Sequence, residues 1–98
     1  MVVELAIFYI AGLQYCSKGL ELFLDRDEYL SLKREESNPN DKYAIAIYKD
    51  DIKLGYIPKG INRNIYSYLD NDIEIKVLKF NKELPPWERI EVVIFLEE

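Results

Sequence analysis

The sequence contains no histidine and only one cysteine, Cys16. Without histidine, the chain cannot build Ser–His–Asp or Cys–His catalytic groups or a histidine-ligated metal site. A single cysteine cannot form an internal disulfide, and it leaves the usual structural zinc sites without ligands. We therefore expect no enzyme activity, no metal and no cofactor, and we interpret Cys16 as a small buried hydrophobic residue.

Phosphate-binding loops and long apolar segments are also missing. The sequence has no GxxxxGK[ST] or GxGxxG motif, and no apolar run approaches the roughly 20 residues that cross a bilayer. The N-terminal segment 1–12 is apolar, but it contains Glu4 and no basic residue, which favours a first strand over a signal peptide. We expect a cytoplasmic protein with no membrane partner.

The composition is that of one folded domain with an acidic surface. Of the 98 residues, 49% are hydrophobic, whereas Gly and Pro number only 4 each, which argues against disorder. The net charge of −5 argues against nucleic-acid binding, because proteins that bind nucleic acid usually present a basic field to the phosphates.

Alternation of apolar and polar residues predicts a chain of short strands. The clearest pair is a hairpin that turns at 49–51. Both sides of the first strand are mostly apolar, so we expect that strand to lie in the centre of the sheet. The predicted strands are residues 2–11, 29–34, 43–48, 52–57, 73–80 and 89–96.

One helix is predicted between the fourth and fifth strands. Pro58 ends the preceding strand, and an apolar stripe at i, i+4, i+7 and i+8 indicates a helix over residues 61–70. The segment 82–87 (KELPPW) is predicted to be a loop because it contains two prolines. The fold class is therefore all-β, β-rich with one short helix, arranged as a small barrel or a strongly curled sheet.

Three segments carry a resemblance to a known family. They are Ala-Gly-Leu-Gln-Tyr-Cys at 11–16, Leu-Lys-Arg-Glu at 32–35 with Asn-Pro-Asn-Asp-Lys-Tyr-Ala-Ile at 38–45, and Leu-Gly-Tyr-Ile-Pro-Lys at 54–59. In this order and spacing they resemble the HIRAN domain, with the similarity covering roughly residues 5–96. The resemblance implies a single HIRAN-like domain over 1–98 that folds as an OB-like six-stranded barrel.

The resemblance also implies a function and a set of site residues. In the best understood members, the HIRAN domain captures the 3′ end of single-stranded DNA: aromatic rings stack on the terminal bases, an aspartate binds the 3′-hydroxyl and basic residues hold phosphates. In this sequence Tyr15 matches the stacking aromatic, Asp41 the carboxylate and Lys59 a phosphate contact. A base offers two π-faces whatever its identity, and a carboxylate distinguishes a terminal hydroxyl from an internal phosphodiester.

The match to the family is partial. Gln14 replaces a basic residue, and Asn40 replaces the aromatic residue that precedes the aspartate. Tyr56 matches another position that lines the site, and Phe80 is a candidate for a late aromatic. Loss of one stacking ring and one phosphate contact costs about 2–5 kcal/mol of binding.

Each site residue also has a purely structural interpretation. Asp41 is equally well placed to bind backbone N–H groups of the turn, Tyr15 to pack in the core and Lys59 to face solvent. If DNA is bound, we expect Lys18, Lys42, Lys59 and Arg63 to lie near one groove.

Two functions from different classes remain open. One is a DNA-end or single-strand binding module, with a helicase or another DNA-repair factor as a protein partner. The other is a protein-interaction or assembly domain that keeps the barrel and has lost DNA binding. A third alternative, a Mg²⁺ nuclease built on Glu74-Ile75-Lys76, is disfavoured because these residues also fit the alternating solvent face of a strand.

Overall fold

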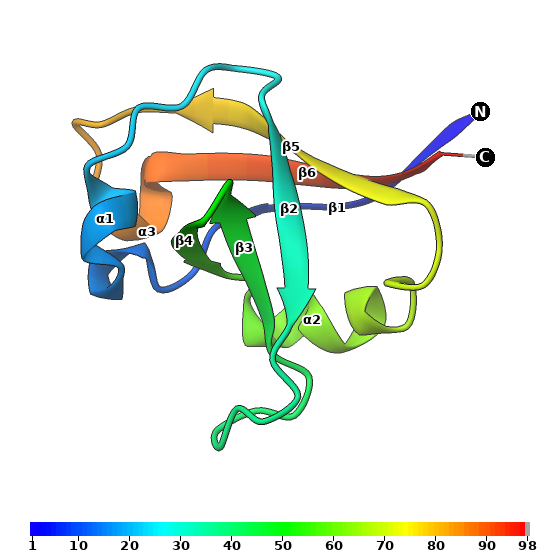
Figure 1. Ribbon diagram of the computed structural model, residues 1–98. Helices are drawn as coiled ribbons and strands as arrows, with labels where there is room; N and C mark the ends of the chain where they lie inside the picture. Colours follow the sequence, from blue (N-terminus) through cyan, green and yellow to red (C-terminus); the bar gives the residue numbers. More distant parts are fainter. Residues whose placement is uncertain (98) are drawn as a thin grey trace.

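The computed structural model describes residues 1–97 and consists of one six-stranded antiparallel sheet with short helices at its ends (Figure 1). The order of strands across the sheet is β1-β6-β5-β2-β3-β4, and all the neighbouring pairs are antiparallel. The predicted β-rich class is confirmed. The strands are β1 (Val2–Tyr9), β2 (Tyr29–Arg34), β3 (Ile45–Lys49), β4 (Ile52–Tyr56), β5 (Ile73–Phe80) and β6 (Ile90–Glu97).

The core lies on the concave side of the curled sheet. Each strand sends alternate side chains inward, as the predicted period of two requires. β5 and β6 contribute fully buried Ile75, Val77, Val92 and Ile94, and the facing strands contribute a second group. That second group is Ile45, Ile47, Leu54 and Leu30.

β1 lies at one edge of the sheet, so the prediction of a central first strand is wrong. Its second apolar side faces solvent: Val2 is 58% exposed and Ile7 is 48% exposed. The apolar side chains on this outward side are therefore not covered by a second layer among the described residues.

The two edge strands approach each other at a single bridge. The N–H of Ala11, just beyond β1, donates to the carbonyl of Tyr56 in β4 at 2.9 Å, and the N–H of Tyr56 donates to the carbonyl of Ala11 at 2.8 Å. This contact is a single bridge and not a strand ladder. The structure therefore shows a curled sheet and does not show the closed barrel that the resemblance implied. Gly55 permits this approach, because a Cβ there would lie 2.2 Å from the carbonyl oxygen of Ala11.

β3 begins two residues later than predicted because Asp41 accepts hydrogen bonds from the two residues before the strand. The N–H of Tyr43 donates to Asp41 Oδ1, and the N–H of Ala44 donates to the Asp41 carbonyl, so these residues form a turn. The predicted hairpin between β3 and β4 is confirmed, with Asp50 in the left-handed region at φ 53°.

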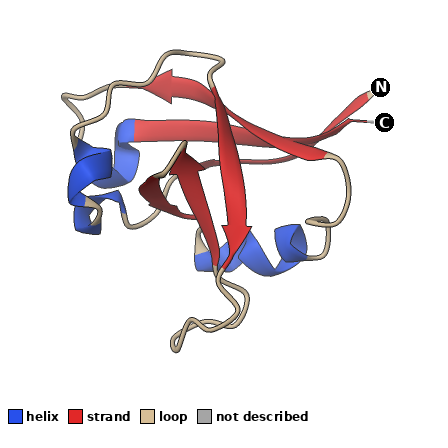
Figure 2. Ribbon diagram, in the orientation of Figure 1, coloured by secondary structure: helices blue, strands red, loops and turns tan. Residues whose placement is uncertain are grey.

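The helices gather at two ends of the strands (Figure 2). At one end lie the 3-10 helix η1 (Leu13–Tyr15), α1 (Ser17–Leu20) and α3 (Pro86–Arg89), all of which are additional to the single helix expected. α3 lies within the predicted loop, and Pro86 starts it because proline suits the first turn of a helix.

The predicted helix, α2 (Lys59–Tyr66), forms at the other end (Figure 2). It starts two residues earlier than expected and gives way to turns at residues 67–70. Within residues 1–97, no helix combines the length and the apolar character needed to cross a membrane.

Candidate nucleic-acid interface

A pocket of about 310 Å³ lies where the β1–η1 segment, the loop before β3 and the start of α2 converge. Four of the residues predicted from the sequence line it: Asn40, Asp41, Tyr56 and Lys59. Gly12 also lines the pocket, with its backbone at φ +79°. The full lining is Ala11, Gly12, Asn38, Asn40, Asp41, Ala44, Tyr56, Ile57, Lys59 and Asn62.

Asp41 is held in place by both of its carboxylate oxygens. Oδ1 accepts a hydrogen bond from the backbone N–H of Tyr43 at 2.9 Å, and Oδ2 accepts one from Nδ2 of Asn62 at 2.7 Å. These two bonds, in that order, lower the pKa of Asp41, and the nearby charge of Lys59 lowers it further. The carboxylate is therefore ionised at neutral pH. The turn role that the sequence allowed for Asp41 is real, and it coexists with a position in the pocket wall.

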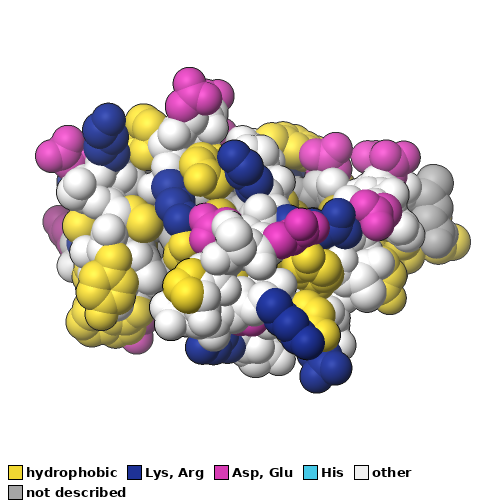
Figure 3. All heavy atoms as spheres, turned by 60° about the horizontal axis from the view of Figure 1, so that its bottom comes forward, with side chains coloured by type: hydrophobic (Ala, Val, Ile, Leu, Met, Phe, Trp, Pro, Cys, Tyr) yellow, Lys and Arg dark blue, Asp and Glu magenta, His cyan; other side chains and the backbone are white. Residues whose placement is uncertain are grey.

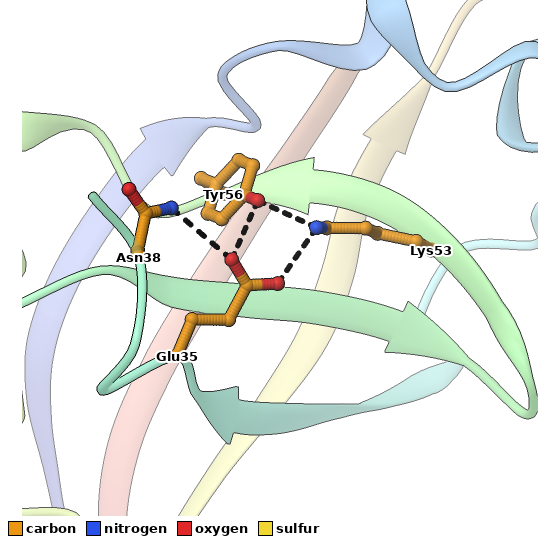
Figure 4. Close-up of polar contacts among 4 residues, drawn as sticks. All are labelled: Glu35, Asn38, Lys53 and Tyr56. Atoms are coloured by element: carbon orange, nitrogen blue, oxygen red, sulfur yellow. Dashed lines mark hydrogen bonds and ion pairs between the residues drawn. The ribbon is translucent and has the colours of Figure 1, made fainter. Parts of the chain in front are cut away.

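Tyr56 is fixed by a hydrogen-bonded network that also includes Glu35, Asn38 and Lys53 (Figure 4). The Tyr56 hydroxyl donates to Glu35 Oε1 at 2.7 Å, and Lys53 Nζ donates to Glu35 Oε2 at 2.7 Å and to the Tyr56 oxygen at 2.5 Å. Nδ2 of Asn38 donates to Glu35 Oε1 at 3.2 Å. Glu35 thus joins the loop before β3 to both ends of β4.

The network shifts the ionisation of its members. Partial burial alone would raise the pKa of Glu35, but the hydrogen bonds from Lys53, Tyr56 and Asn38 outweigh it and lower that pKa. Burial alone would lower the pKa of Lys53, yet its bonds to Glu35 and Tyr56 raise it. Burial is the main reason that the pKa of Tyr56 is raised, so its hydroxyl stays protonated at neutral pH.

Asn38 and Asn62 are site residues that sequence reasoning missed. Oδ1 of Asn38 accepts hydrogen bonds from the backbone N–H groups of Asn40 and Asp41, at 2.9 and 3.2 Å, and so shapes the loop. Asn62 is only 3% exposed, and on the predicted helix it borders the apolar stripe. Asn38 could have been noticed as the polar residue before Pro39, which often starts a turn.

The aromatic and amide residues at 14–15 lie outside the pocket lining. Tyr15, on η1, is 85% exposed, so the interpretation that it packs in the core is wrong. Gln14 is also exposed. α3 contacts η1 and carries a second exposed aromatic residue, Trp87, which is 57% exposed and which sequence reasoning did not select. Phe80 instead packs edge-on against Phe23 at 5.1 Å.

Of the four cations expected near one groove, three lie around α2, and the fourth lies on α1. Lys59 lines the pocket, while Lys42 and Arg63 both lie over the ring of Tyr43, at 5.3 and 5.1 Å from its centroid. Lys18 is on α1, which Figure 1 shows well apart from α2.

No group of three or more acidic or cysteine side chains suited to a metal ion occurs in residues 1–97. Lys76, which the nuclease alternative requires, pairs with Asp27 at 3.6 Å and lies over the ring of Phe95. Burial raises the pKa of the Cys16 thiol, so Cys16 stays protonated at neutral pH.

One family model and two solved structures match this chain. The family model described as the HIRAN domain matches residues 3–98. A crystal structure of a protein from Lactobacillus plantarum is similar with a TM-score of 0.82 and 21% identity, over 98% of this chain and 95% of that one. The crystal structure of the HIRAN domain of human HLTF is similar with a TM-score of 0.71 and 20% identity, over 99% of this chain and 81% of that one. No curated protein matched the sequence.

Proposed function

Because this chain belongs to the HIRAN domain family, we propose that it is a non-catalytic nucleic-acid-binding module that captures the 3′ end of single-stranded DNA. The observation that carries the proposal is that Asp41 and Lys59 line the same small pocket. An ionised carboxylate beside an ammonium group offers an acceptor for a terminal hydroxyl and a donor for the adjacent phosphate.

Asp41 retains capacity for a ligand after its internal bonds are made. A carboxylate has about four acceptor positions, and the bonds from Tyr43 and Asn62 occupy one on each oxygen. A 3′-hydroxyl can therefore donate to Asp41 without displacing either partner. A 3′-phosphate would instead bring negative charge against it.

Stacking on this chain requires aromatic residues outside the pocket. Asn40 provides no ring, and Tyr56 is held by Glu35 and Lys53 as part of the wall. Tyr15 and Trp87 are the exposed rings on the contacting elements η1 and α3, and we assign base stacking to them. Each stacked base contributes about 1–3 kcal/mol.

The test compares two strands that differ only at the end. Fluorescence anisotropy at low salt with 5′-labelled oligonucleotides should show tighter binding to a free 3′-hydroxyl than to a 3′-phosphate. Asp41→Asn, which keeps an acceptor for the backbone of the turn, should remove most of this preference, as should Asp41→Ala. Tyr15→Ala should weaken both ligands alike, because stacking does not sense the terminal group. Equal affinity of the unmodified protein for both strands contradicts end capture.

A second candidate function is supported by the uncovered apolar side of β1. Val2, Ile7 and Tyr9 are 58%, 48% and 42% exposed, and they form an apolar surface on an edge strand of a protein with net charge −5. If neither strand binds at millimolar protein, the chain is better described as a protein-interaction or assembly domain. In either case a helicase or another DNA-repair factor is the partner we propose.

A further inference from the structure

Lys42, Tyr43, Lys59 and Arg63 form one surface beside the pocket, which we call the α2 strip. Lys59 and Arg63 are four residues apart on α2 and therefore project from the same side of the helix. The loop before β3 brings Lys42 and Arg63 to the same ring, Tyr43. The strip adjoins the pocket because Asn62, next to Arg63, donates to Asp41, next to Lys42.

Arg63 differs from the other stacked arginine, Arg34, in what its N–H groups contact. The Arg34 guanidinium lies 4.9 Å from the Tyr66 centroid and is also bound to Asp70 at 3.2 Å. The Arg63 guanidinium lies 5.1 Å from the Tyr43 centroid, and no hydrogen bond or ion pair engages its side chain in the described part of the chain. Stacking on Tyr43 therefore positions a charged group whose donors remain available.

The strip gathers three cations on a protein whose net charge is −5, and Asp41 is the acid beside Lys59. Lys42, Lys59 and Arg63 make no ion pair among residues 1–97, whereas Arg34, Lys49, Lys53 and Lys76 each contact a carboxylate. Figure 3 turns the bottom of the molecule forward, and several Lys and Arg side chains stand along the lower part of that face, with most Asp and Glu side chains above them.

We propose that the α2 strip binds the phosphate backbone of the single-stranded nucleic acid whose 3′ end the pocket holds. The proposal rests on the proposed function in that the pocket holds the end and the strip holds the nucleotides preceding it. The cations suit the phosphates that precede a bound strand end, because Lys59 lines the pocket while Lys42 and Arg63 lie together on the adjoining Tyr43 ring. A peptide of acidic side chains would use the cations but not the pocket beside them.

The experiment measures affinity against strand length. Fluorescein-labelled thymidine oligonucleotides of about 3 and 12 nucleotides would be titrated by anisotropy across a salt series. The unmodified protein should bind the longer strand more tightly. Arg63→Gln should weaken the longer strand by roughly two- to fivefold, the range of an exposed ion pair, and flatten its logarithmic salt slope by about 0.7 per lost phosphate contact. The shorter strand should be unaffected.

Two control variants isolate the strip. Lys79→Gln removes the same net charge from an exposed lysine on β5, and Arg34→Gln removes the arginine whose donors already contact Asp70. Neither should change the salt slope. Equal binding of long and short strands, equal effects of Arg63→Gln and Lys79→Gln, or competition by poly-glutamate as strong as that by the long strand would each overturn the proposal. Loss of discrimination between 3′-hydroxyl and 3′-phosphate, with the length dependence retained, would contradict only end capture.

Discussion

The wall of the pocket and the aromatic surface formed by Tyr15 and Trp87 are built in opposite ways. Asp41 and Tyr56 in the wall, and Glu35 behind it, each have their polar atoms bound to other side chains or to the backbone, at distances of 2.5 to 3.2 Å. On the neighbouring helices, Tyr15 and Trp87 are exposed. The folded chain thus fixes the polar groups before a ligand arrives, whereas the rings keep freedom to adapt. Substitutions should therefore destabilise the wall and spare the aromatic surface.

The largest loss of stability is expected at Gly55, where the backbone of β4 meets that of Ala11. Gly55→Ala would place a Cβ 2.2 Å from the Ala11 carbonyl oxygen, at a residue whose φ is +152°. Backbone strain and overpacking together should lower the free energy of unfolding by about 2–6 kcal/mol. Gly60→Ala is the matched control, because a Cβ at Gly60 meets nothing within 4 Å. Urea denaturation should find the control as stable as the parent protein or more so; equal stability of both variants would contradict the close approach.

The next largest effect concerns Glu35. Glu35→Gln removes the carboxylate that accepts from Lys53 and Tyr56, and should lower the free energy of unfolding by about 1–2 kcal/mol at neutral pH, since the pair is partly exposed. The folded pKa of Glu35 is lowered, so its stabilisation is present above its unfolded pKa of about 4.3 and is lost as the pH falls through the folded value. The variant should accordingly lose less stability than the parent protein between neutral and acid pH.

Glu36→Gln serves as the control for this comparison. Glu36 is the neighbouring acid and is exposed, so its change should leave the unfolding curve within about 0.5 kcal/mol. If Glu35→Gln were as neutral as Glu36→Gln, the network around Tyr56 would not hold the pocket wall together.

Short-range patterns in the sequence predicted most of the strands and part of the site. β2 and β5 have the predicted bounds, although the register of β5 shifts between Val77 and Lys79, and the hairpin at Asp50 follows from its local turn. Asn40, Asp41, Tyr56 and Lys59 converge as the family resemblance implied. These features depend on neighbours in the sequence or on motifs that the family shares.

Features that depend on distant contacts were not predictable. Asn62 is one such case, because its bond to Asp41 joins residues 21 apart in the chain and no local pattern indicates it. The edge position of β1 was missed because an apolar outward side is the same in sequence whether it is covered or exposed. Trp87 lies in a segment whose prolines indicated a loop, yet Pro86 begins a helix that contacts η1.

A smaller effect is expected on the pKa of Asp41 when its partner Asn62 is replaced. Its folded pKa is lowered by the bonds from Tyr43 and Asn62, so its contribution is present above its unfolded pKa of about 3.9 and is lost as the pH falls through the folded value. Asn62→Ala removes one of these bonds and should shift the pKa of Asp41 upward, toward its ordinary value. A carbon-detected NMR titration of the carboxyl groups measures this directly, and an unchanged Asp41 pKa would refute the coupling.

The smallest effect on stability is expected at the aromatic surface, where the contrast with the wall is sharpest. Tyr15→Ala and Trp87→Ala should each change the free energy of unfolding by less than about 0.5 kcal/mol, because both rings are mostly exposed in the folded protein. The same substitutions should weaken binding of a short thymidine oligonucleotide, by about 1–3 kcal/mol for each base that loses its stacking partner. If both rings contact one ligand, the double variant should lose less affinity than the sum of the single losses. Strictly additive losses would place the two rings on separate bases, and a fall in stability comparable to that of Glu35→Gln would mean that the rings belong to the fold rather than to the binding surface.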